Sequence, residues 1–382
     1  MLRVVISIQV FLAFFALQAS GQVKIRLFAA KPLHWIVFNV NEGSYRLDFY
    51  DDAPIYLKKG DNAIVSFYNG KVAVKTKGDS GFTCDSMVFT GQTGQDLFSV
   101  RVGNEPATGR IYDGDLQCIH DLGFLVLINT CNIDRYIAGV VQAEGGTGKN
   151  IEYIKSQALI ARTYMYRYLN KHIIDGYNLC DGTHCQAYMG NSQDPAINRA
   201  VLETTGLVVL GRDSLPIMSA FHSNCGGETE SSENVWLSGQ PYLKKVVDPY
   251  CTGSRNAKWT KSITVKEWKD YLRNSGFTTP EAGKPDLNFS QITRQKDYRT
   301  GSFSLPFTKI RDDFNLKSSF FSVVQSGDSM IFRGKGYGHG VGLCQEGAMV
   351  MAAQGKNYRQ ILQFYYSNII ISDIRNAKNP AQ

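Results

Sequence analysis

The sequence predicts an α+β fold, in which a helical cleft region packs on an antiparallel β-sheet and follows a β-rich N-terminal region. Three observations support this prediction. Short β-type runs separated by turn residues fill residues 22–130. The apolar period then changes to that of helices, and a glycine-rich turn near residue 336 leads into further helices. Strands are therefore expected before, between and after the helices.

The N-terminal strands are marked by β-branched and aromatic residues. Residues 25–28 (IRLF) and 63–68 (AIVSFY) are each followed by a turn or polar break. The break after the second run is Asn69-Gly70, which is typical of a two-residue hairpin turn. We expect a β-rich region here.

Two helices follow this region. Apolar residues recur on one helical face from Ile151 to Met165, which predicts a helix over about 150–171. A shorter helix is expected over 134–143, and the glycine turn at 145–148 joins the two.

The remaining chain mixes both element types. Thr264 opens a capping box for a helix that Gly276 can end. Strands are expected over 200–210, 216–222, within 302–332 and over 369–371, and helices up to about 354 and over 358–366. The expected organisation is a signal peptide (1–21), the N-terminal region (22–130), the first part of a core (131–250), an intervening helix and strands (251–330) and the C-terminal part of the core (331–375).

Composition excludes several classes of protein. The 382 residues are 43% hydrophobic and 20% charged, which is typical of a folded globular chain and unlike a disordered one. Eight cysteines are too few for a scaffold built from disulfides. The net charge is +7, but the basic residues are scattered, so we expect no nucleic-acid partner.

The first residues resemble a secretory signal peptide. Arg3 is their only charge, an apolar stretch runs over 4–17, and small residues stand at 19–21. A membrane anchor, the alternative, needs about 20 apolar residues. We therefore expect an extracytoplasmic protein, in the periplasm or cell wall, released by cleavage of this peptide.

Three common enzyme motifs are absent from the sequence. The run Gly146-Thr147-Gly148-Lys149 fails the phosphate-loop pattern, because Ala143 and Asn150 stand where glycine and Ser or Thr are required. The alternating glycines over 334–342 do not have dinucleotide-binding spacing. No H-E-x-x-H zinc-protease motif occurs.

Three polar blocks carry a specific resemblance. The first is Tyr136–Glu144 (YIAGVVQAE) with Ile154–Tyr164 (IKSQALIARTY). The second is Phe221–Glu230 (FHSNCGGETE), followed by Val235-Trp236 and 241–243 (PYL), and the third is Gly336–Ala348 (GYGHGVGLCQEGA). In this order the blocks resemble the stage II sporulation protein D family (SpoIID/LytB), over roughly residues 134–371.

The resemblance implies a peptidoglycan lytic transglycosylase, a carbon–oxygen lyase that cleaves the MurNAc-β-1,4-GlcNAc bond and leaves 1,6-anhydro-MurNAc ends. Glu144 stands at the position of the family's catalytic acid/base. A single carboxylate suffices, because the C6 hydroxyl of the muramic acid replaces the water or the second carboxylate of ordinary glycosidases. Read without the resemblance, Glu144 is equally a surface residue at a helix end.

Further candidates are assigned to glycan binding. Arg162 could bind the muramic carboxylate, or it could form a structural ion pair. Ser223 could contact sugar, although its Gly-rich surroundings equally indicate a close backbone approach. His339 could line the site or cap the next helix. The proposed substrate-binding residues are Arg162, Gln186, Tyr188, Ser223, His339 and Gln345, and Tyr164, Tyr188 and Trp236 could provide stacking faces for sugars.

Cys180, His184 and Cys185 form a compact set of soft metal ligands. They fit a structural zinc site, with His172 or Cys225 as candidates for the fourth ligand. A disulfide is the alternative, and the sequence does not choose between them. The reaction itself requires no cofactor. A cysteine nucleophile at Cys225, with His222 or His339 as base, lacks any surrounding peptidase signature.

The expected partners are peptidoglycan glycan strands, with an amidase or another cell-wall hydrolase as a further candidate. The rival function follows from family members named amidase enhancers, which would bind glycan and stimulate a partner without cutting. Two departures from the family leave room for it, since Cys344 and Glu346 stand where Ser and Trp are common.

Overall fold

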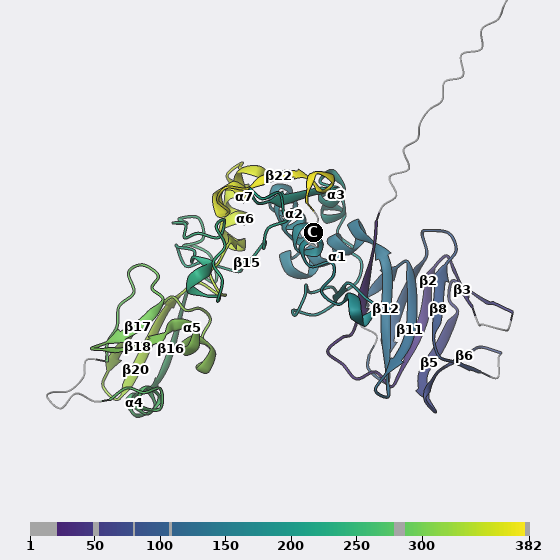
Figure 1. Cartoon of the computed structure of the whole chain (residues 1–382), viewed down its shortest axis with the longest axis horizontal. Helices are drawn as coiled ribbons and strands as arrows, with labels where there is room; N and C mark the ends of the chain where they lie inside the picture. Colours follow the sequence, from purple (N-terminus) through teal and green to yellow (C-terminus); the bar gives the residue numbers. More distant parts are fainter. Residues whose placement is uncertain (1–20, 49–52, 79–80, 107–108, 279–286, 379–382) are drawn as a thin grey trace, which may run out of the picture.

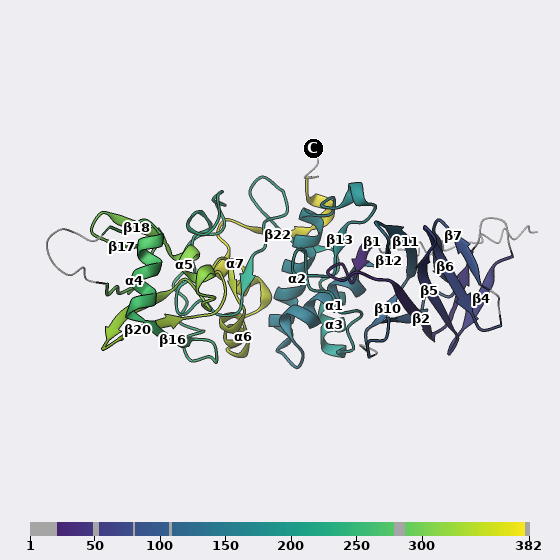
Figure 2. The same cartoon turned by 90° about the horizontal axis from the view of Figure 1, so that it is seen from below.

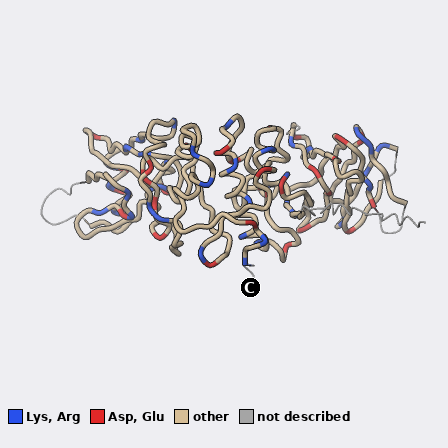
Figure 3. The backbone as a smooth tube through the Cα atoms, turned by 90° about the horizontal axis from the view of Figure 1, so that it is seen from above, with Lys and Arg blue, Asp and Glu red and all other residues tan. Residues whose placement is uncertain are grey.

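The computed structural model describes residues 21–48, 53–78, 81–106, 109–278 and 287–378. The chain is elongated, with a β-rich unit at one end, helices in the middle and a smaller strand-containing unit at the other end (Figures 1, 2 and 3). The predicted signal peptide lies outside the described residues except for Gly21. Within the described ranges, no helix combines the length and the apolar character needed to cross a membrane.

Two sheets form the N-terminal unit. One has the strand order β13-β1-β12-β11-β8-β3-β4 and the other β10-β9-β2-β5-β6-β7. The strands of the first sheet are β13 (Leu179–Cys180), β1 (Gln22–Leu27), β12 (Phe124–Asn132), β11 (Asp115–Asp121), β8 (Met87–Gly91), β3 (Ser44–Leu47) and β4 (Ile55–Lys58). The strands of the second sheet are β10 (Ile111–Asp113), β9 (Leu97–Val102), β2 (Trp35–Glu42), β5 (Asn62–Tyr68), β6 (Lys71–Thr76) and β7 (Phe82–Cys84).

The two sheets pack through alternating apolar residues. In β1, buried and less buried side chains alternate, as they do in a strand with one covered face. Phe38 of β2 stacks on Phe89 of β8, with ring centroids 4.0 Å apart, and thereby joins the sheets. The predicted hairpin turn is confirmed, because β5 and β6 are connected by Asn69-Gly70, both with positive φ.

Helices α1 (Ile133–Gly145) and α2 (Ile151–Arg167) follow directly from β12. Asn132 and Asn150 cap their first turns through side-chain oxygens that accept backbone N–H bonds. Eleven of the seventeen residues of α2 are buried, so α2 forms the centre of the helical region. Helix α3 (Pro195–Glu203) packs on both.

The chain returns to this helical region at its C-terminal end. Strand β21 (Leu343–Cys344) pairs with β15 (Phe221–His222), and β22 (Ile370–Asp373) pairs with β14 (Leu207–Leu210). Helices α6 (Gln345–Ala353) and α7 (Tyr358–Tyr365) pack against α2. Short 3₁₀ turns occur at Ile173–Asp175, Ser232–Asn234 and Ile374–Asn376.

The intervening residues form the smaller unit, with its own core around Trp268. A three-stranded sheet has the order β16-β20-β19, and β17 pairs with β18. The bounds are β16 Lys258–Thr264, α4 Val265–Asn274, β17 Asp297–Thr300, β18 Phe303–Pro306, α5 Phe307–Asp313, β19 Phe321–Ser326 and β20 Ser329–Lys335.

The predicted α+β class with a β-rich N-terminal region is confirmed, and α1 packs on the predominantly antiparallel seven-stranded sheet. Two local predictions are wrong, and the strand predicted over 216–222 is confirmed only at Phe221–His222. Residues 200–203 end α3 rather than begin a strand, because Asp194 and Pro195 start a helix there. Residues 307–313 form α5, whereas continuous strand alternation was expected.

Candidate functional site

Glu144 lies in the last turn of α1 with a half-buried side chain. Its Oε1 accepts a hydrogen bond of 2.9 Å from the backbone N–H of Ala187. Its Oε2 has no hydrogen-bond partner among the residues that the structure describes. One carboxylate oxygen is thus anchored while the other remains available to a ligand.

The segment that holds Glu144 approaches α1 unusually closely. A Cβ added to Gly139 would lie 2.2 Å from the carbonyl oxygen of Gly190 and 2.6 Å from a ring carbon of Tyr188. Real Cβ atoms do not come so close, so residues 187–190 can rest on α1 only because Gly139 has no side chain. Gly139, the glycine of the first block, therefore allows the segment that contains Ala187 to pack against α1.

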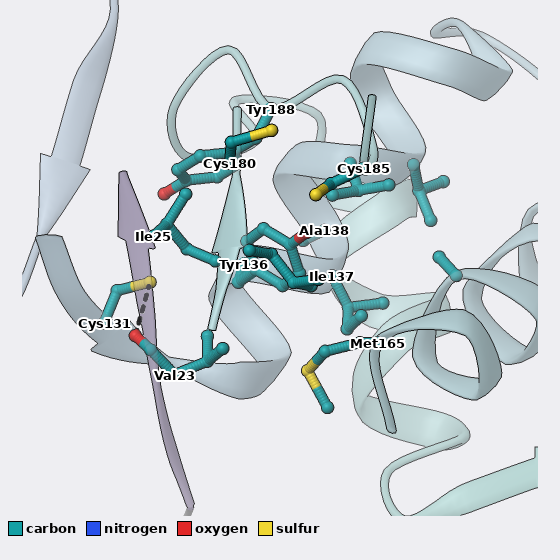
Figure 4. Packing of buried hydrophobic residues seen from close by; sticks show 14 of the residues in the cluster. Val23, Ile25, Cys131, Tyr136, Ile137, Ala138, Met165, Cys180, Cys185 and Tyr188 are labelled. Atoms are coloured by element: carbon teal, nitrogen blue, oxygen red, sulfur yellow. Dashed lines mark hydrogen bonds between the residues drawn. The ribbon is translucent and has the colours of Figure 1, made fainter. Parts of the chain in front are cut away.

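Tyr188 belongs to this buried packing and is not exposed on the surface of the protein. It is fully buried, with ring centroids 5.0 Å from Tyr136 and 5.8 Å from Tyr112. Figure 4 shows Tyr188 and Tyr136 in the interior together with Cys180 and Cys185. Tyr188 offers no face to a sugar, and we do not retain it as a glycan contact.

Gln186 is also largely buried, and its Oε1 accepts a bond of 3.4 Å from the Tyr136 hydroxyl. Gln345 reaches the same end of α1 from the third block. Its Nε2 donates to the backbone carbonyl of Glu144 at 3.0 Å and to Gln157 Oε1 at 3.4 Å. The structure therefore brings Glu144 and Gln345 together.

Arg162 points to the opposite end of α1. Its guanidinium donates to Asp134 at 2.9 Å and to the carbonyls of Thr204, Leu207 and Val201, and the residue is 1% exposed. Asp134 precedes Glu144 by ten residues, about 15 Å along a helix. Arg162 fixes the end of α3 on α1, and we do not retain it as a glycan contact.

The second and third blocks lie directly on each other. A Cβ on Gly338 would be 2.8 Å from His222 Cβ, and one on Gly342 would be 2.1 Å from the Ala220 carbonyl oxygen. Both glycines have positive φ. The alternating glycines of the third block thus permit a close approach of its backbone to the second block.

Ser223 takes part in a polar network at this junction. Asn256 Nδ2 donates to Ser223 Oγ at 3.2 Å and to Glu346 Oε1 at 2.6 Å. Glu346 Oε2 accepts a further bond of 2.6 Å from Asn224. Glu346 therefore holds two asparagines in place.

His339 is half-buried between His222 and Trp236, with centroid distances of 5.5 Å and 5.3 Å. Burial, with Arg311 and Arg294 adding to it, lowers the pKa of His339 to about 4. Its Nδ1 accepts the backbone N–H of Val341 at 3.0 Å, so it caps no helix. Trp236 lines an adjacent hollow of about 630 Å³ with Lys296 and Thr308.

The structure unites four metal-ligating side chains: His172, Cys180, His184 and Cys185. Their ligand atoms all lie within 4.8 Å of one another. The sulfur–nitrogen separations are 3.5 Å (Cys185–His172), 3.8 Å (Cys180–His184) and 3.8 Å (Cys185–His184). Tetrahedral zinc with thiolate and imidazole ligands places such atoms about 3.6 Å apart, so the set fits a zinc ion.

The contacts around these four side chains also suit a zinc ion. His172 Nδ1 faces Asp175 Oδ2 at 3.2 Å while its Nε2 faces Cys185, as in carboxylate–histidine–zinc arrangements. Asp181 accepts the backbone N–H groups of Phe28 and Ala29 at 2.6 Å and 3.1 Å, which ties this loop to the end of β1. His172, rather than Cys225, is the fourth member, because Cys225 lies in another cluster.

Comparisons with known proteins show the family of the chain. A family model described as "Stage II sporulation protein" (SpoIID) matches residues 123–210. Stage II sporulation protein D of Bacillus amyloliquefaciens is 31% identical over 263 residues, which cover 63% of this chain and 74% of that protein. The chain belongs to the SpoIID family.

Two further proteins are similar to this SpoIID-family chain. An amidase enhancer of Bacillus subtilis (strain 168) is 30% identical over 283 residues, covering 60% of this chain and 39% of that protein. An uncharacterized protein of Brachyspira hyodysenteriae is 28% identical over 338 residues, covering 87% of this chain and 88% of that protein. Membership of the SpoIID family and these names support a role connected with the cell wall.

The SpoIID motifs did not reveal every contact of the site. The backbone of Ala187 carries no signature in a sequence, because any residue other than proline offers the same N–H. Asn256 lies outside the three blocks and meets Ser223 and Glu346 only after folding. Gln157 was visible within the first block, but nothing in its spacing indicated a contact with Gln345.

Proposed function

We propose that this SpoIID-family protein is a secreted peptidoglycan lytic transglycosylase with Glu144 as its single acid/base. The observation that carries the proposal is the half-anchored carboxylate: Oε1 is held by Ala187 N–H at 2.9 Å and Oε2 is without a partner in the described part of the chain. A general acid needs both a fixed orientation and a free oxygen. Glu144 stands at the family's acid position and also has a carboxylate that is held at one oxygen only.

In the proposed reaction, protonated Glu144 donates its proton to the glycosidic oxygen as the bond from C1 of N-acetylmuramic acid to O4 of N-acetylglucosamine breaks. The C6 hydroxyl of the same muramic residue forms a new bond to C1. The carboxylate then takes the proton of that hydroxyl, which restores the acid. No water is consumed, and the product carries a 1,6-anhydro end.

Gln345, Ser223 and His339 remain the proposed glycan-binding residues, whereas Gln186 is largely buried against Tyr136 and is not retained as one. Gln345 contacts the backbone of Glu144, while Ser223 and His339 belong to the junction of the second and third blocks. Trp236 is half-buried beside His339 and provides an aromatic face for a sugar ring.

A zinc ion at His172, Cys180, His184 and Cys185 would have a structural role, since transglycosylation needs no metal-bound hydroxide. Cys185 precedes Ala187 by two residues. The four side chains would hold the loop from which Ala187 donates to Glu144.

A second candidate is supported by the relative named amidase enhancer. In that role the protein would bind glycan strands and stimulate a partner amidase. In the third block, this chain has Glu346 and Cys344 where Trp and Ser are common in the family. These two differences favour the alternative, because they alter the block that approaches Glu144.

The deciding experiment incubates the purified mature protein with peptide-stripped glycan strands and identifies the products by mass spectrometry. We expect anhydro-muramyl ends from the wild type and none from Glu144→Gln. Glu203→Gln is the matched control, because Glu203 also ends a helix but is exposed and paired with Lys155. Products with an added water would indicate a hydrolase. No cleavage, with glycan still bound, would favour the amidase enhancer.

A further inference from the structure

A second group of metal-ligating side chains lies away from the first, at the junction of the second and third blocks. Cys225, Asp248, Cys251 and Cys344 have ligand atoms within 4.8 Å of one another. All four residues are fully buried. We propose that these four side chains bind a second, structural zinc ion. This inference is independent of the reaction proposed for Glu144.

The geometry is that of a closed four-ligand site. Cys225 Sγ lies 3.3 Å from Cys251 Sγ and 3.2 Å from Asp248 Oδ2. Around tetrahedral zinc, two thiolate sulfurs lie about 3.8 Å apart and a sulfur and a carboxylate oxygen about 3.5 Å apart. A shift of roughly half an ångström would therefore admit the ion.

The buried carboxylate is a separate reason to expect a cation. Asp248 accepts bonds of 2.9 Å from the Tyr365 hydroxyl and the Tyr250 N–H, but no Lys or Arg pairs with it in the described ranges. A buried carboxylate without a positive partner is costly. A divalent cation between Asp248 and the thiols would supply the missing charge.

The sulfurs also receive N–H donors of the kind that surround metal-bound thiolates. Cys344 Sγ accepts the backbone N–H groups of Cys225 at 3.3 Å and Gly347 at 3.4 Å. The Arg294 guanidinium donates to the Cys225 carbonyl at 2.8 Å and brings a positive charge beside the cluster. These groups would stabilise the net negative charge of a zinc site with three thiolates and one carboxylate.

The donor set selects the metal class. Three thiolates in a buried, closed, tetrahedral arrangement favour zinc over the oxygen-preferring Mg²⁺ and Ca²⁺. Binding converts three thiols to thiolates and releases their protons to solvent, with no change in oxidation state. The ion would join the turn after β15, the loop at 248–251 and the start of α6.

A disulfide between Cys225 and Cys251 is the competing outcome. It would use two sulfurs and leave Cys344 and the carboxylate of Asp248 buried without a cation. The metal site accounts for all four side chains, whereas the disulfide accounts for two.

The test measures zinc per chain by elemental mass spectrometry in the full mature protein, purified without metal resin. Cys251→Ser is expected to lose about one zinc ion relative to the wild type, and Cys185→Ser to lose the ion of the first cluster. The control Cys131→Ser alters a buried thiol outside both clusters and should retain the wild-type content. An unchanged zinc content in Cys251→Ser would overturn the proposal.

Two further measurements guard against misfolding of that variant. Cys344→Ser keeps a side chain able to cap α6 through the Gly347 N–H, and it should lose zinc while keeping the wild-type circular dichroism. In unfolded, chelator-treated wild type without reductant, Cys225, Cys251 and Cys344 should all be alkylated. A Cys225–Cys251 disulfide in that peptide map would overturn the proposal.

Discussion

Glu144 is held by the backbone N–H of Ala187 at 2.9 Å, and Ala187 follows the ligand cluster of Cys185 by only two residues. The proposed acid and the proposed zinc ion are therefore connected by one short segment. The same segment rests on α1 through Gly139. The orientation of one carboxylate thus depends on a close helix contact and on a loop that a metal ion would brace.

Removal of metal from the first cluster is expected to lower both stability and activity. Cys185→Ser should reduce Tm, because the loop at 180–188 loses the ion that holds it. Calorimetry and the anhydro-end assay measure the two effects. Cys131→Ser is the control for loss of a buried thiol. An unchanged Tm after verified metal removal would contradict a structural role.

Gly139→Ala should destabilise the fold and reduce activity together. The new methyl group would collide with the Gly190 carbonyl and the Tyr188 ring, and we expect a loss of about 1–3 kcal/mol from overpacking. Urea unfolding measures this loss. Gly253→Ala, where a Cβ meets nothing within 4 Å, is the matched control and should behave as the wild type. Equal stability of the two variants would argue against the close approach.

Arg162→Leu should affect stability and not glycan binding. It leaves Asp134 and the carbonyls of Thr204 and Val201 without their buried donor, at a cost of about 3 kcal/mol or more. Denaturant unfolding and KM for glycan strands separate the roles. A raised KM with an unchanged unfolding midpoint would restore Arg162 as a substrate contact.

Stability should fall as the pH falls from about 6.5 towards 4. Burial lowers the pKa of His339 to about 4 and that of His222 well below its usual range, whereas both titrate near 6.5 in the unfolded chain. The unfolded state therefore binds protons first as the pH falls, and it is favoured by up to about 1.4 kcal/mol per pH unit for each histidine.

The check for this pH dependence is urea unfolding between pH 7 and 5. His339→Gln should flatten the dependence of the unfolding free energy on pH. His34→Asn, which changes an exposed histidine, should leave that slope as it is. Identical slopes in all three proteins would show that His339 does not contribute.

Much of the fold followed from local patterns, and the failures have physical reasons. The period of α2 and the Asn69-Gly70 turn are local, so the sequence alone predicted them. The helix α5 was missed because its seven residues lie between strands and it is stabilised by packing of Phe307 and Ile310 rather than by a long helical pattern.

The candidate site was predicted less completely. Cys180, His184 and Cys185 are close in sequence, and their grouping was visible before folding. The burial of Tyr188 and the pairing of Arg162 with Asp134 depend on contacts between distant segments, which residue types do not reveal. For the same reason, the cluster of Cys225, Asp248, Cys251 and Cys344 became apparent only in three dimensions.

The position of β1 constrains the order in which the protein assembles. β1 begins at Gln22, yet it lies between β12 and β13, and the bond from Phe28 to Asp181 spans 153 residues. A chain that emerges N-terminus first leaves both edges of β1 unpaired until residues far downstream have appeared. β1 therefore stays incomplete until β13 (Leu179–Cys180) has been made, and β1 and the loop bearing Cys180 are completed together.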